Sequence, residues 1–262
     1  DSIYRANGYK VGLFSSPHLI ELGERIQING ENITEDEINQ WVNRLKPLAQ
    51  KMEEDESENH PTFFEFMTAV AFLHFQKHGV DLAVIETGLG GRLDSTNVVA
   101  PELSIITTIS KDHCAILGNS LEEITQEKAG IIKRDTPVLI GDLPNCSVEV
   151  VQNIAIQRNS ELHSISHLVQ EERPQTNLQG SYQRANAALA LRGVEIVRKK
   201  FPIENDLARQ GLNQVSLLGR WQIIEGSPRV ILDACHNSAG AICLRENLAA
   251  LSEKPEIWLG VL

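Results

Sequence analysis

Short apolar runs alternate with longer amphipathic segments along most of this chain. Short runs of branched aliphatic side chains are typical of buried strands, and apolar positions spaced three and four apart are typical of helices. The alternation predicts an α/β fold in which helices flank a mostly parallel sheet. Strands are predicted at residues 11–14, 82–85, 103–109, 137–140, 229–233 and 256–262. Helices are predicted at residues 35–52, 63–78, 121–130, 147–159, 182–200 and 239–251.

Three of the predicted helices begin with a capping box, in which a Ser or Thr is followed three residues later by Glu. The pairs are Thr34 with Glu37, Thr62 with Glu65, and Ser120 with Glu123. Near the start of the chain, residues 3–6 resemble the end of a helix closed by Asn7 and Gly8. The acidic stretch at residues 53–60 is expected to be a solvated loop.

The segment most informative about function is residues 81–97. Its apolar run at 82–85 has the composition of a strand buried on both faces, and it ends at Glu86. Ligands bind where such strands end. The three glycines that follow allow positive φ angles and close approach of the backbone to a phosphate, while Arg92 and Asp94 add a donor and an acceptor. This pattern predicts a metal or phosphate site, although it also fits an ordinary turn between a strand and a helix.

A second polar cluster follows the strand predicted at 103–109. Asp112 and His113 lie just past its end, where loops of neighbouring parallel strands converge, so His113 could reach the same crevice as Glu86. Imidazole is a less usual Mg²⁺ ligand than oxygen, so His113 taken alone fits a core or surface histidine better. Lys128 taken alone fits a solvated helix lysine paired with an acid.

Composition narrows the class of protein. The 262 residues have room for one or two domains, and a hydrophobic content of 42% can fill a sizeable core. A net charge of −11 argues against nucleic acid and anionic membranes as partners, and no apolar run has membrane-spanning length. The four scattered cysteines argue against both a zinc site and a disulfide framework. These observations fit a reducing cytoplasm, and we separately expect a monomer.

Several segments, taken in order, resemble one enzyme family. They are SSPHL at 15–19, ERIQING at 24–30, FFEFMT at 63–68, ETGLGGRLDSTN at 86–97, DHCAILG at 112–118, EKAGIIK at 127–133, LQGSYQRAN at 178–186, GR at 219–220 and DACHN at 233–237. Together they are similar to folylpolyglutamate synthase, often bifunctional with dihydrofolate synthase, in the Mur-ligase superfamily.

The resemblance implies two domains. Residues 1–214 would be a Mur-ligase-like central ATP-binding domain, and residues 215–262 would begin a Rossmann-like C-terminal glutamate-ligase domain. The family's phosphate-binding loop would lie upstream of Asp1. Both ends are therefore expected to be cut, and this fragment alone is expected to be inactive.

The chemistry implied by the resemblance is that of an ATP-dependent amide ligase. Such an enzyme phosphorylates a folate carboxylate to an acyl phosphate, which the amino group of L-glutamate then attacks. ATP repels the carboxylate, so Mg²⁺ and cationic groups must offset charge along the phosphates. By resemblance, Glu86 and Ser16 correspond to ligands of one Mg²⁺ and His113 to a ligand of a second. Lys128 corresponds to a lysine that the superfamily carbamylates, and the carbamate would be a further metal ligand. Glu86, His113 and Lys128 are therefore the implied catalytic group.

The second half of the chain resembles the family's nucleotide-binding motifs. By resemblance, Gln183 and Asn186 correspond to residues at the adenine, and Arg220 corresponds to a residue at the phosphates. Asp233 corresponds to a residue at the ribose or the interdomain hinge, and His236 and Asn237 correspond to residues near the nucleotide. On local sequence alone, Asn186 would be a polar residue of an amphipathic helix and Arg220 a surface arginine after a turn glycine.

The folate side of the site is implied by three further residues. Phe64, Asp94 and Ser95 correspond to positions that bind dihydropteroate in bifunctional members of the family. Phe64 equally fits core packing beside its capping box.

Two other functions stay open at the level of sequence. One is a Mur-type ligase that joins amino acids to a UDP-N-acetylmuramoyl peptide and shares the same use of ATP. The other is a non-catalytic remnant that binds nucleotide. A complete phosphate-binding loop in the residues before Asp1 would exclude the remnant.

Overall fold

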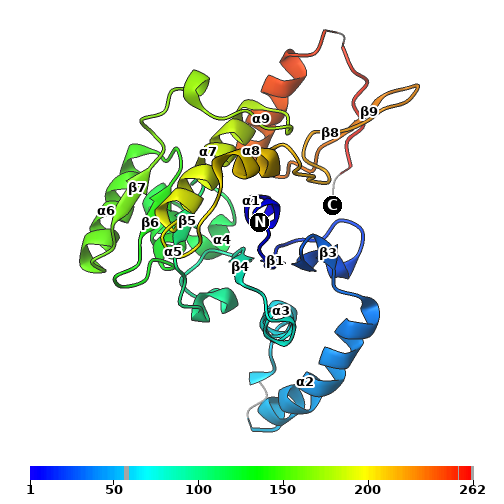
Figure 1. The fold of residues 1–262 in the computed structure, drawn as a ribbon, viewed down its shortest axis with the longest axis vertical. Helices are drawn as coiled ribbons and strands as arrows, with labels where there is room; N and C mark the ends of the chain where they lie inside the picture. Colours follow the sequence, from blue (N-terminus) through cyan, green and yellow to red (C-terminus); the bar gives the residue numbers. More distant parts are fainter. Residues whose placement is uncertain (56–58, 253, 261–262) are drawn as a thin grey trace.

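The computed structural model describes residues 1–55, 59–252 and 254–260, which fold into three β-sheets with helices around them (Figure 1). Sheet A has the strand order β3-β2-β1-β4, sheet B has the order β5-β6-β7, and sheet C pairs β8 with β9. The strands are β1 (Val11–Phe14), β2 (Ile26–Ile28), β3 (Glu31–Asn32), β4 (Leu82–Ile85), β5 (Ser104–Ile106), β6 (Val138–Ile140), β7 (Leu162–Ser164), β8 (Gln222–Ile224) and β9 (Val230–Leu232).

The helices in the described part of the chain include all of those predicted from the sequence and two others, Cys114–Leu117 and Asn205–Leu212, that were not predicted. They are α1 (Ser2–Ala6), α2 (Glu35–Asp55), α3 (Phe63–His78), α4 (Cys114–Leu117), α5 (Leu121–Ala129), α6 (Asn145–Gln157), α7 (Ser181–Ile196), α8 (Asn205–Leu212) and α9 (Ser238–Ala249), with 3-10 turns η1 (Leu22–Arg25), η3 (Ser95–Val98) and η4 (Gln170–Glu172). The three predicted capping boxes are confirmed at the starts of α2, α3 and α5. Within the described residues, no helix has the length and apolar character needed to cross a membrane.

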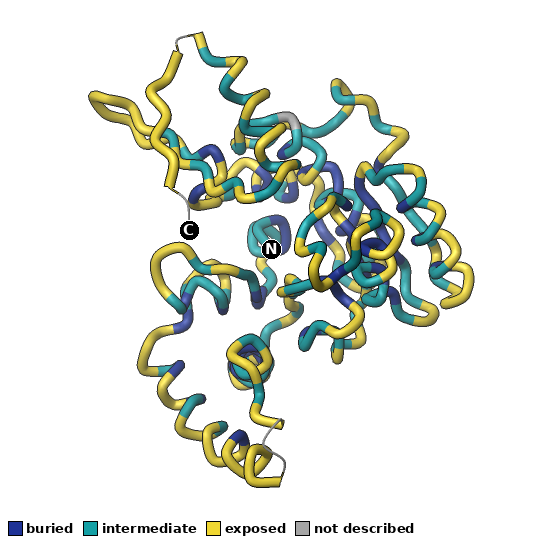
Figure 2. The backbone as a smooth tube through the Cα atoms, turned by 180° about the vertical axis from the view of Figure 1, so that it is seen from behind, coloured by how far each residue is buried: buried dark blue, intermediate teal, exposed yellow. Residues whose placement is uncertain are grey.

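Sheet B lies between two layers of helices. Its strands are all parallel, and alternate side chains of β6 point to opposite faces. Val138 and Ile140 join a buried cluster with Ile124 of α5, whereas Leu139 packs with Leu189 of α7 on the other face. Figure 2 shows several buried, dark blue segments in this part of the chain. The predicted α/β architecture is therefore confirmed.

Sheet A packs against α3 on one face and against α1, α7 and α8 on the other. Phe14 of β1 is buried with Val70 and Phe75 of α3, and Val11 is buried with Ala187 of α7. At Gly12 of β1, a Cβ atom would lie 2.9 Å from the Phe75 ring. The missing side chain lets α3 sit directly on β1.

The prediction that β4 is buried on both faces is wrong. Ala83 and Val84 are exposed, with 37% of the Val84 surface accessible. In the described residues β4 is an edge strand of sheet A, paired only with β1, and β5 is an edge strand of sheet B. An edge strand has a neighbour on one side only, so the surrounding layers cover it less completely than a central strand. The expected single sheet is thus divided, and β2 and β3 add antiparallel pairing to sheet A.

Two further expectations from the sequence are wrong. The predicted strand at 256–262 is absent from residues 256–260, where Trp258 is 87% exposed, and residues 261–262 lie outside the described part. An apolar run becomes a strand only where another strand offers hydrogen bonds, and none does so here among the described residues. The acidic loop expected at 53–60 begins later, because α2 continues to Asp55, and residues 56–58 lie outside the described part.

Candidate functional site

The first part of the candidate site lies at the end of two parallel strands. Phe14 of β1 is paired with Ile85 of β4, so the loops that follow both strands leave the same edge of sheet A. The backbone N–H of Ser16 donates to Glu86 Oε2 at 2.8 Å. The structure therefore brings together the two residues that the resemblance assigns to one Mg²⁺.

The electrostatics of Glu86 are unusual for a carboxylate that solvent can reach. Surrounding protein desolvates the group and raises its pKa, while the Ser16 N–H and the nearby Arg220 guanidinium act in the opposite direction. Arg220 comes from the segment before β8, far along the chain. A cation placed beside Glu86 would offset the remaining cost of its charge.

The glycine-rich loop after Glu86 is held by its own last carboxylate. Asp94 accepts hydrogen bonds from the backbone N–H groups of Gly88, Leu89 and Thr96 at 2.8, 2.9 and 3.0 Å. It also caps η3. The predicted acceptor in this loop thus binds the loop itself.

All three loop glycines approach protein atoms closely, Gly88 and Gly91 more than Gly90, whose Cβ would lie 2.9 Å from the Leu117 side chain. A Cβ at Gly88 would lie 2.5 Å from the Phe64 ring, and a Cβ at Gly91 would lie 2.6 Å from the Lys128 carbonyl oxygen. Gly90 has φ +67°, which glycine adopts without strain. The close approach that the sequence attributed to a phosphate is, at Gly88 and Gly91, an approach to α3 and α5.

The same loop is fixed to α5 by charge. Arg92, the predicted donor, forms an ion pair with Glu127 at 3.0 Å, and its backbone N–H donates to the Glu127 carbonyl. The next residue on α5 is Lys128, which is half-buried. Among the described residues, the Lys128 side chain forms no hydrogen bond or ion pair, and Glu86 and His113 share none with each other. The predicted meeting of these three side chains stays a prediction.

The segment around sheet C lies over the first loops. Asp233 accepts from the backbone N–H groups of Trp221 and Cys235, both at 3.0 Å, which joins the start of β8 to the turn after β9. A Cβ at Gly219 would lie 3.0 Å from the Leu19 side chain, in the loop that contains Ser16. Asp233 therefore positions the Gly219 turn against the loop after β1.

A second contact joins this segment to the loop after β5. The Asn237 side-chain amide donates to Asp112 Oδ2 at 2.9 Å, and the Asn237 oxygen caps α9. Burial works to raise the pKa of Asp112, but the Asn237 amide and the charges of His113 and His236 together hold it below its ordinary value. His113, His236 and Asn237, three predicted site residues, thus gather around one carboxylate.

The residues predicted to face adenine lie together on α7. Gln183 is buried, and its side-chain oxygen accepts from the Asn186 amide at 3.1 Å. The neighbouring Tyr182 lies within the electrostatic reach of Asp233 and Arg220. α7 therefore presents these amides near the same segment that carries Arg220.

The three residues assigned to dihydropteroate are also close together. The Phe64 ring stacks beside Phe14 with centroids 5.6 Å apart, as the core-packing alternative expects. The Ser95 hydroxyl lies 2.8 Å from the Thr68 hydroxyl, which donates to the Phe64 carbonyl. These contacts make one small polar network at the base of the glycine-rich loop, next to Asp94.

Sequence reasoning missed the residues that join segments. The partners Asp112 and Asn237 are 125 positions apart, and no local pattern relates them. Arg92 and Glu127 are 35 positions apart, yet both were in motifs already singled out for chemistry. The opposite charges of Arg92 and Glu127 were the signal in the sequence from which this ion pair could have been predicted.

Known proteins resemble this chain in sequence and in fold. The profile of the Mur ligase middle domain family matches residues 33–196. The dihydrofolate synthase/folylpolyglutamate synthase of Bacillus subtilis is 38% identical over 271 residues, which cover 94% of this chain and 63% of that protein. The enzyme of the same name from Escherichia coli is 32% identical over 98% of this chain and 61% of its own length. The chain thus spans less than two thirds of these relatives.

Solved structures give the same answer. An FPGS–AMPPCP–folate complex, in which FPGS stands for folylpolyglutamate synthase, has a TM-score of 0.90 at 30% identity, covering 97% of this chain and 68% of that one. Mycobacterium tuberculosis folylpolyglutamate synthase, complexed with ADP and AMPPCP, has a TM-score of 0.86 at 31% identity, covering 95% of this chain and 62% of that one. The family profile covers more than half of the residues, and the fold agrees with it. The chain therefore belongs to the Mur ligase middle domain family.

Proposed function

We propose that this chain is the central part of an ATP-dependent ligase that adds L-glutamate to folate, as a folylpolyglutamate synthase does. The observation that carries the proposal is the contact of Ser16 with Glu86 under the charge of Arg220. It places an incompletely compensated carboxylate at the end of parallel strands, where ligands of such sheets bind. The relatives solved with AMPPCP and folate support the choice of substrates.

The residues present fit a divalent cation. Glu86 is a desolvated carboxylate that accepts one described hydrogen bond, so its second oxygen is available to a hard cation. In the proposed site Glu86 and the Ser16 hydroxyl would hold one Mg²⁺, and His113 would contribute to a second. When bound, Mg²⁺ offsets the negative charge of the ATP phosphates.

The chain's own groups would carry the other requirements of the reaction. A folate carboxylate attacks the γ-phosphorus of ATP to give an acyl phosphate and ADP. The glutamate amine then attacks the acyl carbon, and phosphate leaves as the amide forms. Arg220 would stabilise charge on the phosphates, and the amides of Gln183 and Asn186 would contact adenine. Asp233 would hold the Arg220 turn in place.

Nucleotide and folate would contact different residues of this group. His236 and Asn237, beside Asp112, would contact the nucleotide. Phe64 would offer an apolar ring to the pterin, with Asp94 and Ser95 fixing the loop beside it. A second activity, addition of glutamate to dihydropteroate, is favoured by the two-function name of the Bacillus subtilis relative. The Mur-type and remnant alternatives have no comparable observation in their favour.

The domain division at 214/215, the cytoplasmic location and the monomeric state belong to the same proposal. The experiment is a turnover assay of the full-length protein with ATP, L-glutamate and either tetrahydrofolate or dihydropteroate, with a UDP-N-acetylmuramoyl peptide as the competing acceptor. We expect ADP release that depends on a folate acceptor. Release that depends on the muramoyl acceptor alone would support the Mur-type reading, and no release with any acceptor would support the remnant.

Lys128 provides a separate test of the proposed chemistry. We propose that Lys128 is carbamylated in the active enzyme, because a carbamate offers anionic oxygens to a metal where an ammonium would repel it. Replacing it by alanine should abolish turnover, and a short-chain carboxylic acid should restore part of the activity. ¹³C NMR of protein equilibrated with ¹³CO₂ should show the carbamate in the wild type only. Full activity of Lys128→Ala would refute this role.

A further inference from the structure

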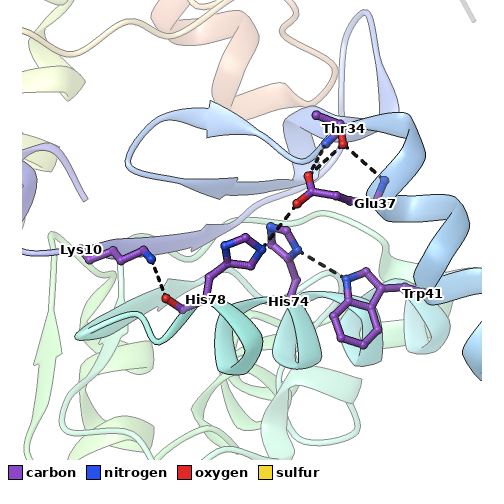
Figure 3. A network of polar contacts seen from close by, with 6 residues as sticks. All are labelled: Lys10, Thr34, Glu37, Trp41, His74 and His78. Atoms are coloured by element: carbon purple, nitrogen blue, oxygen red, sulfur yellow. Dashed lines mark hydrogen bonds and ion pairs between the residues drawn. The ribbon is translucent and has the colours of Figure 1, made fainter.

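A cluster of metal-ligand side chains lies between α2 and α3, outside the site described above. Glu37 comes from the first turn of α2, and His74 and His78 come from the last turns of α3 (Figure 3). The two histidines are four positions apart, so they lie on one face of α3. One ligand atom from each residue lies within 4.8 Å of the others. His74 is buried, and Glu37 and His78 are half-buried.

One polar atom of this cluster has no hydrogen bond. His78 Nε2 is buried without a hydrogen-bond partner, and its nearest charged atom is Glu37 Oε1 at 3.5 Å. That separation is too long for a hydrogen bond. Two ligands that sit about 2.0–2.2 Å from a tetrahedral Zn²⁺ are themselves separated by roughly 3.4 Å. The gap between Glu37 and His78 therefore has the width that a shared metal ion needs.

The Glu37 carboxylate is held in a fixed orientation by Thr34. Glu37 Oε2 accepts from the Thr34 backbone N–H at 3.1 Å and from the Thr34 hydroxyl at 2.9 Å, which leaves Oε1 facing the histidines. The Thr34 backbone N–H also holds the pKa of Glu37 below its ordinary value. The capping box thus supplies an ionised, fixed ligand, and little conformational freedom remains to be lost on binding.

The buried His74 ring is suited to bind a metal ion. Burial, with the neighbouring His78 charge, lowers the pKa of His74 to about 4, so its ring is neutral. Its ring lies 4.4 Å from the His78 ring, centroid to centroid. A metal must find its imidazole ligands without a proton in the bonding lone pair. At His74 no charge has to be removed first.

We propose that Glu37, His74 and His78 form a binding site for one transition-metal ion of the Zn²⁺ type, with water in the fourth position. Two imidazoles and one carboxylate suit Zn²⁺, Co²⁺ or Ni²⁺ far better than Mg²⁺, which prefers oxygen. The scattered cysteines argued against a zinc site, but these ligands are of another kind. The site shares no residue with the proposed nucleotide site, so it does not depend on the proposed function.

The contact between Trp41 and His74 opposes metal binding at His74. Its indole Nε1–H donates to His74 Nδ1 at 3.4 Å, a long hydrogen bond that keeps the His74 proton on Nε2. Coordination through Nε2 moves that proton to Nδ1, where it would face the indole N–H. Ligand atoms of the group that are as far apart as 4.8 Å must also move closer by about an ångström, whereas Glu37 and His78 already have the required spacing. Metal binding should therefore displace Trp41 and change its fluorescence.

The test is a titration of the full-length protein with Co²⁺ in excess Mg²⁺, followed by visible absorption, with Zn²⁺ as the competitor. We expect one Co²⁺ per chain with the absorption of a tetrahedral site, displaced by Zn²⁺. Replacing either Glu37 by Gln or His78 by Ala should weaken binding by more than about tenfold. The matched control is His163→Ala, because His163 also faces a carboxylate, Glu161 at 3.4 Å, but belongs to no three-ligand group among the described residues, and it should leave the affinity unchanged.

A further variant tests His74 itself. Trp41→Phe removes the competing N–H while keeping an aromatic ring, so it should tighten Co²⁺ binding several-fold. If His78→Ala fails to fold, Glu37→Gln gives the same comparison, since its amide oxygen still accepts from Thr34. Equal Co²⁺ affinity of the wild type and Glu37→Gln would overturn the proposal. An affinity that Trp41→Phe leaves unchanged would remove His74 from the ligands and overturn the three-residue site.

Discussion

Two carboxylates mark the beginning and the end of the glycine-rich loop, and they behave differently. Asp94, eight positions after Glu86, accepts hydrogen bonds from the backbone of Gly88, Leu89 and Thr96. Its oxygens are occupied by the loop that contains it. A carboxylate bonded in this way holds a backbone conformation, and it has little capacity left for a ligand.

Glu86 has the opposite character. It accepts one backbone hydrogen bond, from Ser16, and the partial charge compensation comes from Arg220 in a distant segment. Burial that is not matched by partners raises its pKa, which is a cost to the folded protein. The two acids of one motif therefore differ: Asp94 holds the loop backbone, whereas Glu86 keeps one oxygen without a hydrogen bond among the described residues, which is the oxygen the proposed cation would use.

The largest effect that tests this difference between Glu86 and Asp94 is the loss of activity expected when Glu86 is replaced. Glu86→Gln keeps the shape and removes the charge, so the full-length enzyme should lose about two to three orders of magnitude in kcat/KM. The free energy of unfolding should stay equal or rise, because a poorly compensated charge is removed. Steady-state kinetics and thermal unfolding of the same samples measure both quantities. Unchanged turnover would show that Glu86 is not a ligand of the proposed metal.

Asp94 should show the reverse pattern. Asp94→Ala leaves three backbone N–H groups without their acceptor, and we expect a loss of about 3 kcal/mol in the free energy of unfolding. Asp94→Asn keeps one oxygen and should lose less. Urea unfolding monitored by circular dichroism gives the values. A stability loss at Asp94 no larger than that of Glu86→Gln would contradict the assigned difference.

A feature could be predicted from the sequence when the residues that determine it lie close together in the chain. The capping boxes, the strand that ends at Glu86 and the limits of α3 depend on neighbours within a few residues, and they were predicted correctly. The role of Asp94 in the loop depends on which backbone groups turn toward it, and composition does not specify that. The Asp112 to Asn237 contact and the edge position of β4 depend on segments far apart in the chain.

A smaller effect is expected where the loop rests on α5. Gly91→Ala would place a Cβ 2.6 Å from the Lys128 carbonyl oxygen, and helix backbone cannot yield as a flexible side chain can. We expect a loss of about 2 kcal/mol in the free energy of unfolding. Gly226→Ala is the matched control, because its nearest atom would be 3.4 Å away. Equal stability of the two variants would mean that the close packing of Gly91 against α5 does not contribute to the stability of the protein.

The smallest expected effect is a pH dependence of stability that arises from the raised pKa of Glu86. Its folded pKa lies above the ordinary value of 4.5, so between those two values the folded state holds a proton that the unfolded state has released. Stability therefore falls as pH rises through that interval, and the loss is complete above the folded pKa. Glu86→Gln carries no charge at any of these pH values and should escape the loss.

The difference in unfolding free energy between Glu86→Gln and the wild type should therefore grow as pH rises from 4.5 and then level off. Paired urea titrations from pH 4 to pH 8 measure it, and the common titration of all other groups cancels in the subtraction. Added Mg²⁺ should then reduce the difference at pH 8, because only the ionised Glu86 gains a partner. A difference that shrinks as pH rises would mean that Ser16 and Arg220 already compensate the Glu86 charge in full. Glu86 would then resemble Asp94, and the contrast within the loop would disappear.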